Sequence, residues 1–283
     1  MTPAAAVLAA AATALANEGV LLRAGGDAVI VDALFREGIR GYASLPAGER
    51  QALEEGRAPY DGVGVALATH AHADHFDPEA VRAWLAAHPD GHFVSTPQAV
   101  ARLRGAGGSR VRGLLPAAGA REVLALGKAR VTVFNLHHGE GQPVSNLGFL
   151  VELGGRRFLH VGDTEVTAAE LRPLHLESAR IDLALLPFWT LLGPEAGAIQ
   201  EAIGARAVAA VHVPAPDAPA DYFGPPGSLE GLRAALSRRW PAALLAYPPG
   251  TVLPLAAPAS AVQRNTRSSR SGMASGATGG ENR

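Results

Sequence analysis

Four residues of types that commonly bind metals lie within six positions of one short segment, residues 69–76, which reads THAHADHF. The chain has 283 residues but only ten histidines and no cysteine, so three histidines here are a marked concentration. Imidazole and carboxylate are the ligands that zinc takes when thiolate is absent. His70 and His72 share a face of an extended segment and can converge on one point. A following turn would direct Asp74 and His75 to a second point nearby.

A structural explanation for the same segment is a polar loop that caps the next helix. Residues 77–88 read as a helix with Asp77 as its N-cap and Pro78 at its first position. Capping explains Asp77 but leaves the three histidines without a role. We therefore favour metal binding.

A metal site needs three or four protein ligands, with a position left open for water if it is catalytic. Further candidates lie where apolar strands are expected to end, before a glycine or proline turn. They are His137 or His138 after the strand 130–138, Asp163 in HVGDT, and His212 in AVAAVHVP. Loops at such strand ends are common places for binding residues.

The elements that position these residues alternate along the chain. A hairpin is expected over 19–32, buried strands over 64–70, 181–188 and 207–214, and two strands joined by a glycine turn over 147–163. Helices are expected over 49–56, 77–88, 167–176, 194–204 and 228–240. Hairpins mixed with strand–helix alternation predict a layered α/β architecture with helices outside and sheets inside.

Composition limits the classes of function. The formal net charge is −1, which favours neither nucleic acid nor an anionic membrane as a partner. Residues 1–16 are either a frayed segment leading into the first strand or the remnant of an export signal, although no basic residue precedes Arg23. We expect one domain over 17–256 and a disordered tail over 257–283, which has few large apolar residues. A soluble protein is expected, with the cytoplasm favoured over the periplasm or export, and the oligomeric state stays open.

The motifs HAHADH, HHG, VGDT and VHVP, in this order, resemble those of the metallo-β-lactamase fold superfamily over about residues 17–255. The resemblance implies an αββα sandwich and a metallohydrolase with two zinc ions, with iron or manganese as other possibilities. It assigns His70, His72 and His138 to one metal, Asp74, His75 and His212 to the other, and Asp163 to both. It also implies that a metal-bound hydroxide attacks the substrate and that Asp74 orients this hydroxide. His138 is preferred over His137 because the family has a histidine directly before glycine there.

Departures from the family pattern narrow the reaction. Dizinc enzymes that hydrolyse β-lactams often have cysteine where this chain has Asp163, so that activity is not expected. The diiron branch usually has glutamate at the position of His72, which favours zinc hydrolysis here. The chain also lacks room for the inserted domain of the RNA-processing branch. The resemblance therefore implies a hydrolase that cleaves an ester, lactone or phosphodiester of a small molecule. An iron-dependent oxidoreductase similar to the sulfur dioxygenases is the alternative.

Three segments could form the walls of the substrate pocket: 33–60, 188–192 and 217–227. Phe188 and Trp189 could contact an apolar substrate or only pack locally. Arg36, Arg40 and Tyr42 could bind an anionic group. Of the other histidines, His160 could orient Asp163 or pack within a strand, whereas His88 and His92 are expected to be solvated.

Overall fold

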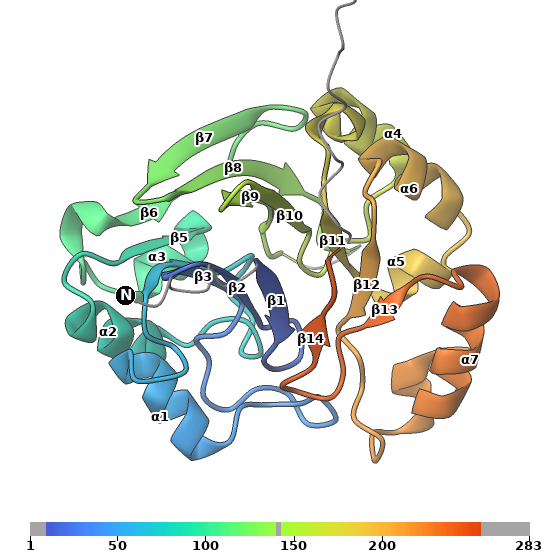
Figure 1. Ribbon diagram of the computed structural model, residues 1–283, viewed down its shortest axis with the longest axis horizontal. Coiled ribbons are helices and arrows are strands. Elements are labelled where there is room, and N and C mark those ends of the chain that lie inside the picture. The colour runs from blue at the N-terminus through green and yellow to red at the C-terminus, as the bar shows by residue number, and fades with distance from the viewer. Residues whose placement is uncertain (1–9, 140–142, 256–283) are drawn as a thin grey trace, which may run out of the picture.

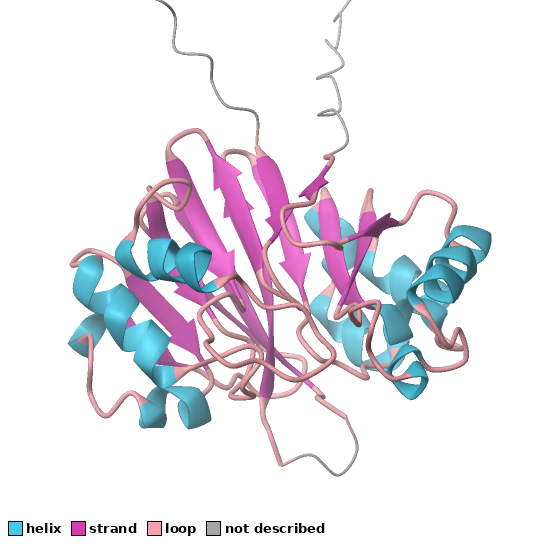
Figure 2. Cartoon of the chain, turned by 90° about the horizontal axis from the view of Figure 1, so that it is seen from below, coloured by secondary structure: helices cyan, strands magenta, loops and turns pink. Residues whose placement is uncertain are grey.

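Two seven-stranded sheets lie face to face, and helices cover the outer face of each (Figure 1). The computed structural model describes residues 10–139 and 143–255. Seen from below, the strands fill the middle, the helices lie on both flanks, and many loops gather at one end of the sheets (Figure 2). The αββα sandwich expected from the sequence is confirmed.

The first sheet joins the N-terminal strands to a short strand from the end of the domain. Its order is β14 (Val252–Leu253), β1 (Ala11–Ala14), β2 (Val20–Ala24), β3 (Asp27–Val31), β4 (Val63–Leu67), β5 (His92–Ser95) and β6 (Val111–Gly113). Pairing is antiparallel from β14 to β3 and parallel from β3 to β6.

The second sheet has the order β13 (Leu244–Leu245), β12 (Val208–Val211), β11 (Leu183–Pro187), β10 (Arg156–His160), β9 (Asn146–Leu153), β8 (Ala129–Leu136) and β7 (Arg121–Leu126). Strands β10 to β13 are parallel, and β7 to β10 pair antiparallel. Strands β8, β10, β11 and β12 therefore all end at the same edge of the sheet. In such sheets ligands bind beyond the carboxyl ends of the strands.

The α-helices divide between the two outer faces. Helices α1 (Ala47–Glu55), α2 (Pro78–Ala87) and α3 (Pro97–Arg102) belong to the first half of the chain, and α4 (Ala168–Leu171), α5 (Phe188–Leu192), α6 (Ala196–Ile203) and α7 (Leu229–Arg239) to the second. Short 3₁₀ segments are η1 (Gly108–Arg110), η2 (Arg172–Leu174), η3 (Leu176–Ala179) and η4 (Ala220–Phe223). Asp77 caps α2 as expected, since its carboxylate accepts from the backbone N–H groups of Glu79 and Ala80.

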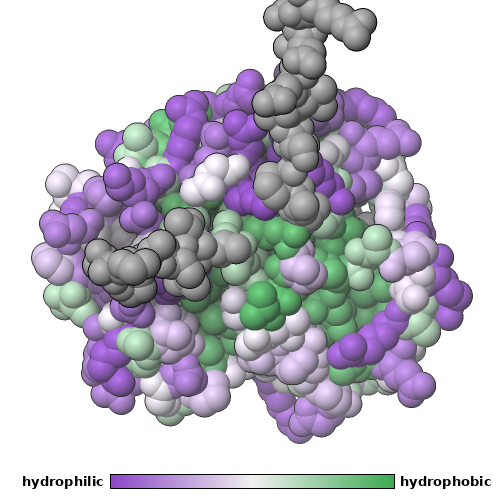
Figure 3. All heavy atoms as spheres, in the orientation of Figure 1, coloured by the Kyte–Doolittle hydropathy of each residue, from purple (hydrophilic) through white to green (hydrophobic). Residues whose placement is uncertain are grey.

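Alternation along the strands builds three apolar layers. The first layer lies between the two sheets and contains strand residues from both, among them Leu22 of β2 and Val133 of β8. Leu21, one position earlier, points to the opposite face and belongs to the layer that contains Trp84 of α2. A third layer lies between the second sheet and helices α4 to α7. Each buried large side chain contributes about 1.5–3 kcal/mol through removal of apolar surface from water. On the face shown in Figure 3, apolar side chains gather in the middle and hydrophilic ones surround them.

The domain begins earlier than the expected boundary at residue 17. Residues 11–14, assigned to a segment outside the domain, form β1, which pairs with both β2 and β14. The sequence AATA has low intrinsic strand propensity, so its two neighbours must supply the stability. The expected tail 257–283 lies outside the described residues.

The expected helix 167–176 is wrong in length. Helix α4 ends at Leu171, and the chain continues as two 3₁₀ turns, η2 and η3. Pro173 cannot donate to an α-helical hydrogen bond, and His175 adopts a left-handed conformation with φ 47°. The other expected helices are present within a few residues of their predicted bounds. No helix within the described parts of the chain is long and apolar enough to cross a membrane.

Candidate metal centre

The seven candidate ligands converge at the loop-rich end of the two sheets. They form two groups, in each of which the ligand atoms lie within 4.8 Å of one another. The groups are His70, His72, His138 and Asp163, and Asp74, His75 and His212. Six of the seven follow parallel strands: the HAHADH residues follow β4, Asp163 follows β10, and His212 follows β12. The seventh, His138, lies in the loop after β8.

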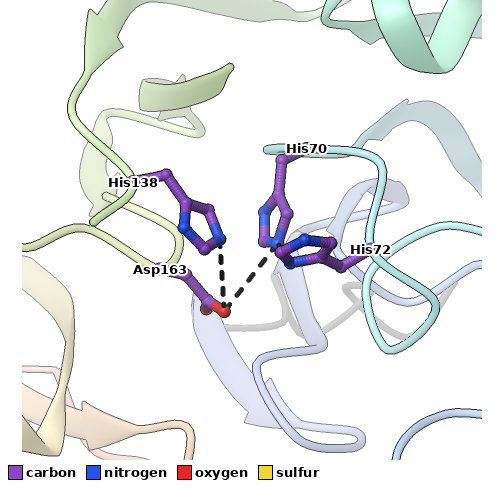
Figure 4. Close-up of side chains that lie close together, drawn as sticks. All are labelled: His70, His72, His138 and Asp163. Atoms are coloured by element: carbon purple, nitrogen blue, oxygen red, sulfur yellow. Dashed lines mark hydrogen bonds and ion pairs between the residues drawn. The ribbon is translucent and has the colours of Figure 1, made fainter. Parts of the chain in front are cut away.

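In the first group the imidazoles point toward one another and toward one carboxylate (Figure 4). Nε2 of His70 lies 3.0 Å from Nδ1 of His72. Nε2 of His70 and Nε2 of His138 each lie 3.8 Å from Oδ2 of Asp163. Two nitrogen atoms bound to one zinc at about 2.1 Å lie roughly 3.0 Å apart at a right angle and roughly 3.4 Å apart at a tetrahedral angle. The separation of the His70 and His72 nitrogens therefore suits a shared metal.

The two histidines of the second group lie close to the same carboxylate. Nε2 of His75 lies 3.3 Å from Oδ1 of Asp163, and Nε2 of His212 lies 3.2 Å from its Oδ2. The same two nitrogen atoms lie 3.6 and 3.7 Å from Oδ2 of Asp74. Asp163 therefore faces imidazoles of both groups.

Asp32, directly after β3, supports two of these imidazoles on the Nδ1 side, one directly and one through Thr69. Its Oδ2 lies 3.0 Å from Nδ1 of His75 and accepts a hydrogen bond of 2.7 Å from the Thr69 hydroxyl. The Thr69 oxygen lies 2.9 Å from Nδ1 of His70. With Nδ1 as the donor in both histidines, Nε2 of each is directed at the cluster. Such support from a carboxylate is typical of histidine metal ligands.

Asp32 is a residue of the site that sequence reasoning missed. A single aspartate at a strand end carries no spacing signal. Its φ of 48°, together with φ 54° at His212, is unusual for a residue with a side chain. Such conformations cluster at functional sites.

Asn17 is a second residue that the sequence analysis missed. It lies in the connection between β1 and β2, and its Nδ2 donates a hydrogen bond of 2.8 Å to Oδ2 of Asp74. Both side chains are buried. This contact links the N-terminal strand pair to the HAHADH segment, which sequence spacing could not reveal.

The structure distinguishes the two neighbouring histidines after β8. His138 lies in the first group, while His137 is exposed and lies in neither. His160 does not contact Asp163 directly. Its Nε2 donates to the backbone oxygen of Glu18 and its Nδ1 accepts from the N–H of Gly162, which fixes the turn before Asp163.

Electrostatics keep the imidazoles of the first group neutral. Burial lowers the pKa of His70 well below its usual range, and the charge of His75 acts in the same direction. Burial likewise lowers the pKa of His138 to about 4. At neutral pH these nitrogen atoms therefore have free lone pairs for a metal.

An ion pair links the two groups, with the cation on His75 of the second group and the anion on Asp163 of the first. Burial opposes the cation of His75, but Asp163, Asp74 and Asp32 together raise its pKa well above the usual range. Burial also opposes ionisation of Asp163, yet His212 and His75 hold its pKa well below the usual range. Without a metal, a proton on His75 partly balances the carboxylates.

Several buried polar atoms of the cluster have no hydrogen-bond partner. These atoms are Oδ1 of Asp74, Nε2 of His75, both ring nitrogens of His138, and Oδ1 of Asp163. Unpaired buried polar atoms are costly, so a cluster of them needs a partner. Nitrogen and carboxylate donors without thiolate suit zinc, iron or manganese. The residues present therefore fit the metals implied by the family.

Each of the three expected wall segments contributes an aromatic residue near His212. The rings of Tyr42 and Trp189 lie 4.4 and 4.8 Å from its ring, and Tyr222 stacks on Tyr42 at 5.6 Å. Arg36, which the sequence offers as a residue to bind an anionic group, donates from Nε and Nη2 to the two carboxylate oxygens of Glu54 at 3.1 and 2.8 Å, so this side of its guanidinium is already paired.

Comparison with known proteins identifies the family. Residues 28–215 match the Beta-lactamase superfamily domain, which is more than half of the chain. The chain therefore belongs to the β-lactamase superfamily. The comparison with curated proteins found no significant match.

Two solved structures similar to this chain are described as hydrolases. A possible metal-dependent hydrolase from Veillonella parvula has 14% identity and a TM-score of 0.59, over 86% of this chain and 98% of that one. An isothiocyanate hydrolase from Delia radicum gut bacteria has 14% identity and a TM-score of 0.57, over 88% and 100%. At these identities the likeness shows the shared fold alone.

A third similar structure belongs to a different class of enzyme. CmlA, a diiron β-hydroxylase from Streptomyces venezuelae, has 16% identity and a TM-score of 0.52. The match covers 72% of this chain but 45% of CmlA, so the chain spans less than half of that protein. The same fold thus occurs with redox chemistry as well as hydrolysis.

Proposed function

We propose that this chain is a metal-dependent hydrolase that holds two metal ions side by side, with zinc as the expected metal. The observation that carries the proposal is the position of Asp163, whose carboxylate lies 3.2–3.8 Å from imidazole nitrogens of both groups. Paired metals in hydrolases are typically about 3.5–4 Å apart, so they need such a shared ligand.

The ligand roles follow the two groups. His70, His72 and His138 would hold one metal, Asp74, His75 and His212 the other, and Asp163 both. Bound zinc supplies a Lewis acid and a water acidic enough to ionise near neutral pH. Such a site suits hydrolysis of an ester, lactone or phosphodiester.

Asp74 is the candidate catalytic residue of this chain. Its Oδ2 is fixed by Asn17, and its Oδ1 is buried and has no partner. Burial opposes its ionisation, but His75 and His212 lower its pKa, so it is an acceptor at neutral pH. The free oxygen can accept a hydrogen bond from the attacking water and thereby orient it.

Metal dependence of turnover tests this function. We expect chelation to abolish hydrolysis of generic aryl esters or bis-aryl phosphates, and zinc to restore it. The double variant His70→Ala, His72→Ala should lose the activity while remaining folded, because Asp163 and the second group stay in place. Full activity in that variant would refute the proposal.

A second candidate function is an iron-dependent oxidoreductase on the same ligands. The similarity to CmlA, described as a diiron β-hydroxylase, supports keeping it. It predicts iron in the purified protein and oxygen uptake with a persulfide substrate, neither of which a zinc hydrolase would show.

A further inference from the structure

A cavity of about 740 Å³ lies beside the metal cluster, between α5, the η4 turn and α7. Its walls include Phe188, Trp189 and Leu192 on one side and Tyr222 and Phe223 on another, with Ala234 on the α7 side. Cavities that bind small organic ligands span roughly 300–1,000 Å³ and are mainly apolar. The size and lining fit an organic group larger than a solvent molecule.

Two wall residues connect this cavity to the metal cluster. Trp189 lines the cavity, and its ring also lies 4.8 Å from the ring of His212. Its Nε1 donates to the backbone oxygen of Thr164 at 3.1 Å, which fixes the ring. Tyr222 lines the cavity and stacks on Tyr42, whose ring lies 4.4 Å from His212. A substrate that reacts at the cluster can therefore place its remaining part along these rings.

The charges around the cavity indicate what that part is. Of the described residues that line it, two are charged, Asp221 and Arg238. Both are exposed and their charges are opposite, so the cavity offers no net attraction for an anion. An uncharged apolar group suits these walls better than a phosphate diester does.

We propose that this cavity binds the apolar acyl chain of the substrate, which makes the substrate an ester or lactone of a medium-length carboxylic acid. This inference rests on the proposed hydrolase function for the reaction itself. In that reaction the acyl C–O bond breaks, and water supplies the oxygen of the new acid and the proton of the alcohol. Burial of each methylene along the walls favours longer chains over acetyl.

Binding to the metal-free protein tests the cavity without catalysis. We expect octanamide, titrated by calorimetry, to bind at least tenfold more tightly than acetamide, because a difference of six methylenes is buried. Equal affinity of the two amides would overturn the proposal.

A matched pair of variants on α7 locates the binding. Ala234 lines the cavity and is exposed, so Ala234→Trp fills the cavity from its rim. Ser237 is exposed on the same helix and does not line the cavity, so Ser237→Trp adds the same bulk elsewhere. Ala234→Trp should weaken octanamide binding about tenfold, and Ser237→Trp should leave it unchanged. Unchanged binding in Ala234→Trp with an unaltered melting temperature would overturn the assignment.

Turnover of 4-nitrophenyl esters separates the two proposals. With zinc present, the ratio of kcat/KM for the octanoate to that for the acetate should be high, and Ala234→Trp should lower it about tenfold. Metal-dependent turnover with no preference for chain length would overturn the cavity assignment and leave the hydrolase function standing. Tight octanamide binding with no ester turnover would support the cavity and count against the function.

Discussion

Oδ2 of Asp32 lies 3.0 Å from Nδ1 of His75, and both side chains are completely buried. Through the Thr69 hydroxyl the same oxygen also supports His70, a ligand candidate of the other group. One carboxylate thus sets the ring orientation of one histidine in each half of the metal centre.

Replacement of this carboxylate tests its role. Asp32→Asn should weaken zinc binding by about 10–100-fold, because His75 loses the charged acceptor of its Nδ1–H and the Thr69 hydroxyl that faces His70 loses a charged acceptor of its own. Competition with a chromophoric chelator measures this. Asp90→Asn, at an exposed position, serves as the control. Equal affinity of the wild type and Asp32→Asn would show that the contact does not support metal binding.

Metal binding should release a proton from His75. The surrounding carboxylates raise its pKa well above the usual range, so it is charged at pH 7 and must lose this proton to become a ligand. His138, with a pKa of about 4, is already neutral and releases none. Calorimetric zinc titrations in two buffers of different ionisation enthalpy count the protons. Binding of the second zinc without proton release contradicts this assignment of charge.

Asn17 should affect turnover more than metal content. Its amide fixes Oδ2 of Asp74, so Asn17→Ala allows the carboxylate to rotate. We expect kcat to fall about tenfold, as is common when a catalytic group is misplaced, with bound metal retained. Gln51→Ala, which removes an exposed contact with Glu55, is the matched control. An unchanged kcat in Asn17→Ala would exclude this positioning role.

Gly162, in the turn before Asp163, should be intolerant of a side chain. Its φ is +61°, and an added Cβ would collide with Asn146 and Thr69. Gly162→Ala should cost about 2–4 kcal/mol of unfolding free energy, from backbone strain and overpacking together. Gly155→Ala has the same sign of φ but open space, and should cost about 1 kcal/mol. Urea unfolding compares the two, and similar losses would show that packing at Gly162 is unimportant.

The fold and the ligand types could be predicted because they depend on local patterns. Apolar strands followed by a histidine or aspartate are visible in the sequence, and His70, Asp163 and His212 all come at the ends of such strands. The choice of His138 over His137 needed the family pattern, since alternation alone only states that the two point in opposite directions.

The parts that could not be predicted depend on contacts between distant segments. Asn17 reaches Asp74 across 57 positions, and Asp32 reaches Thr69 across 37. Strand β1 is alanine-rich and resembles an export signal, and only its pairing with β2 and β14 makes it a strand. Local propensity carries no information about such partners.

The number of zinc ions that each chain binds distinguishes a dinuclear site from a mononuclear one. We expect the metal-free protein, after reconstitution with zinc and removal of unbound zinc, to contain about two zinc ions per chain, as a dinuclear hydrolase site requires. Elemental mass spectrometry measures this number. Asp163→Ala should lower this number, because both groups share that carboxylate. A wild-type protein that retains one zinc or none under these conditions would rule out a dinuclear site.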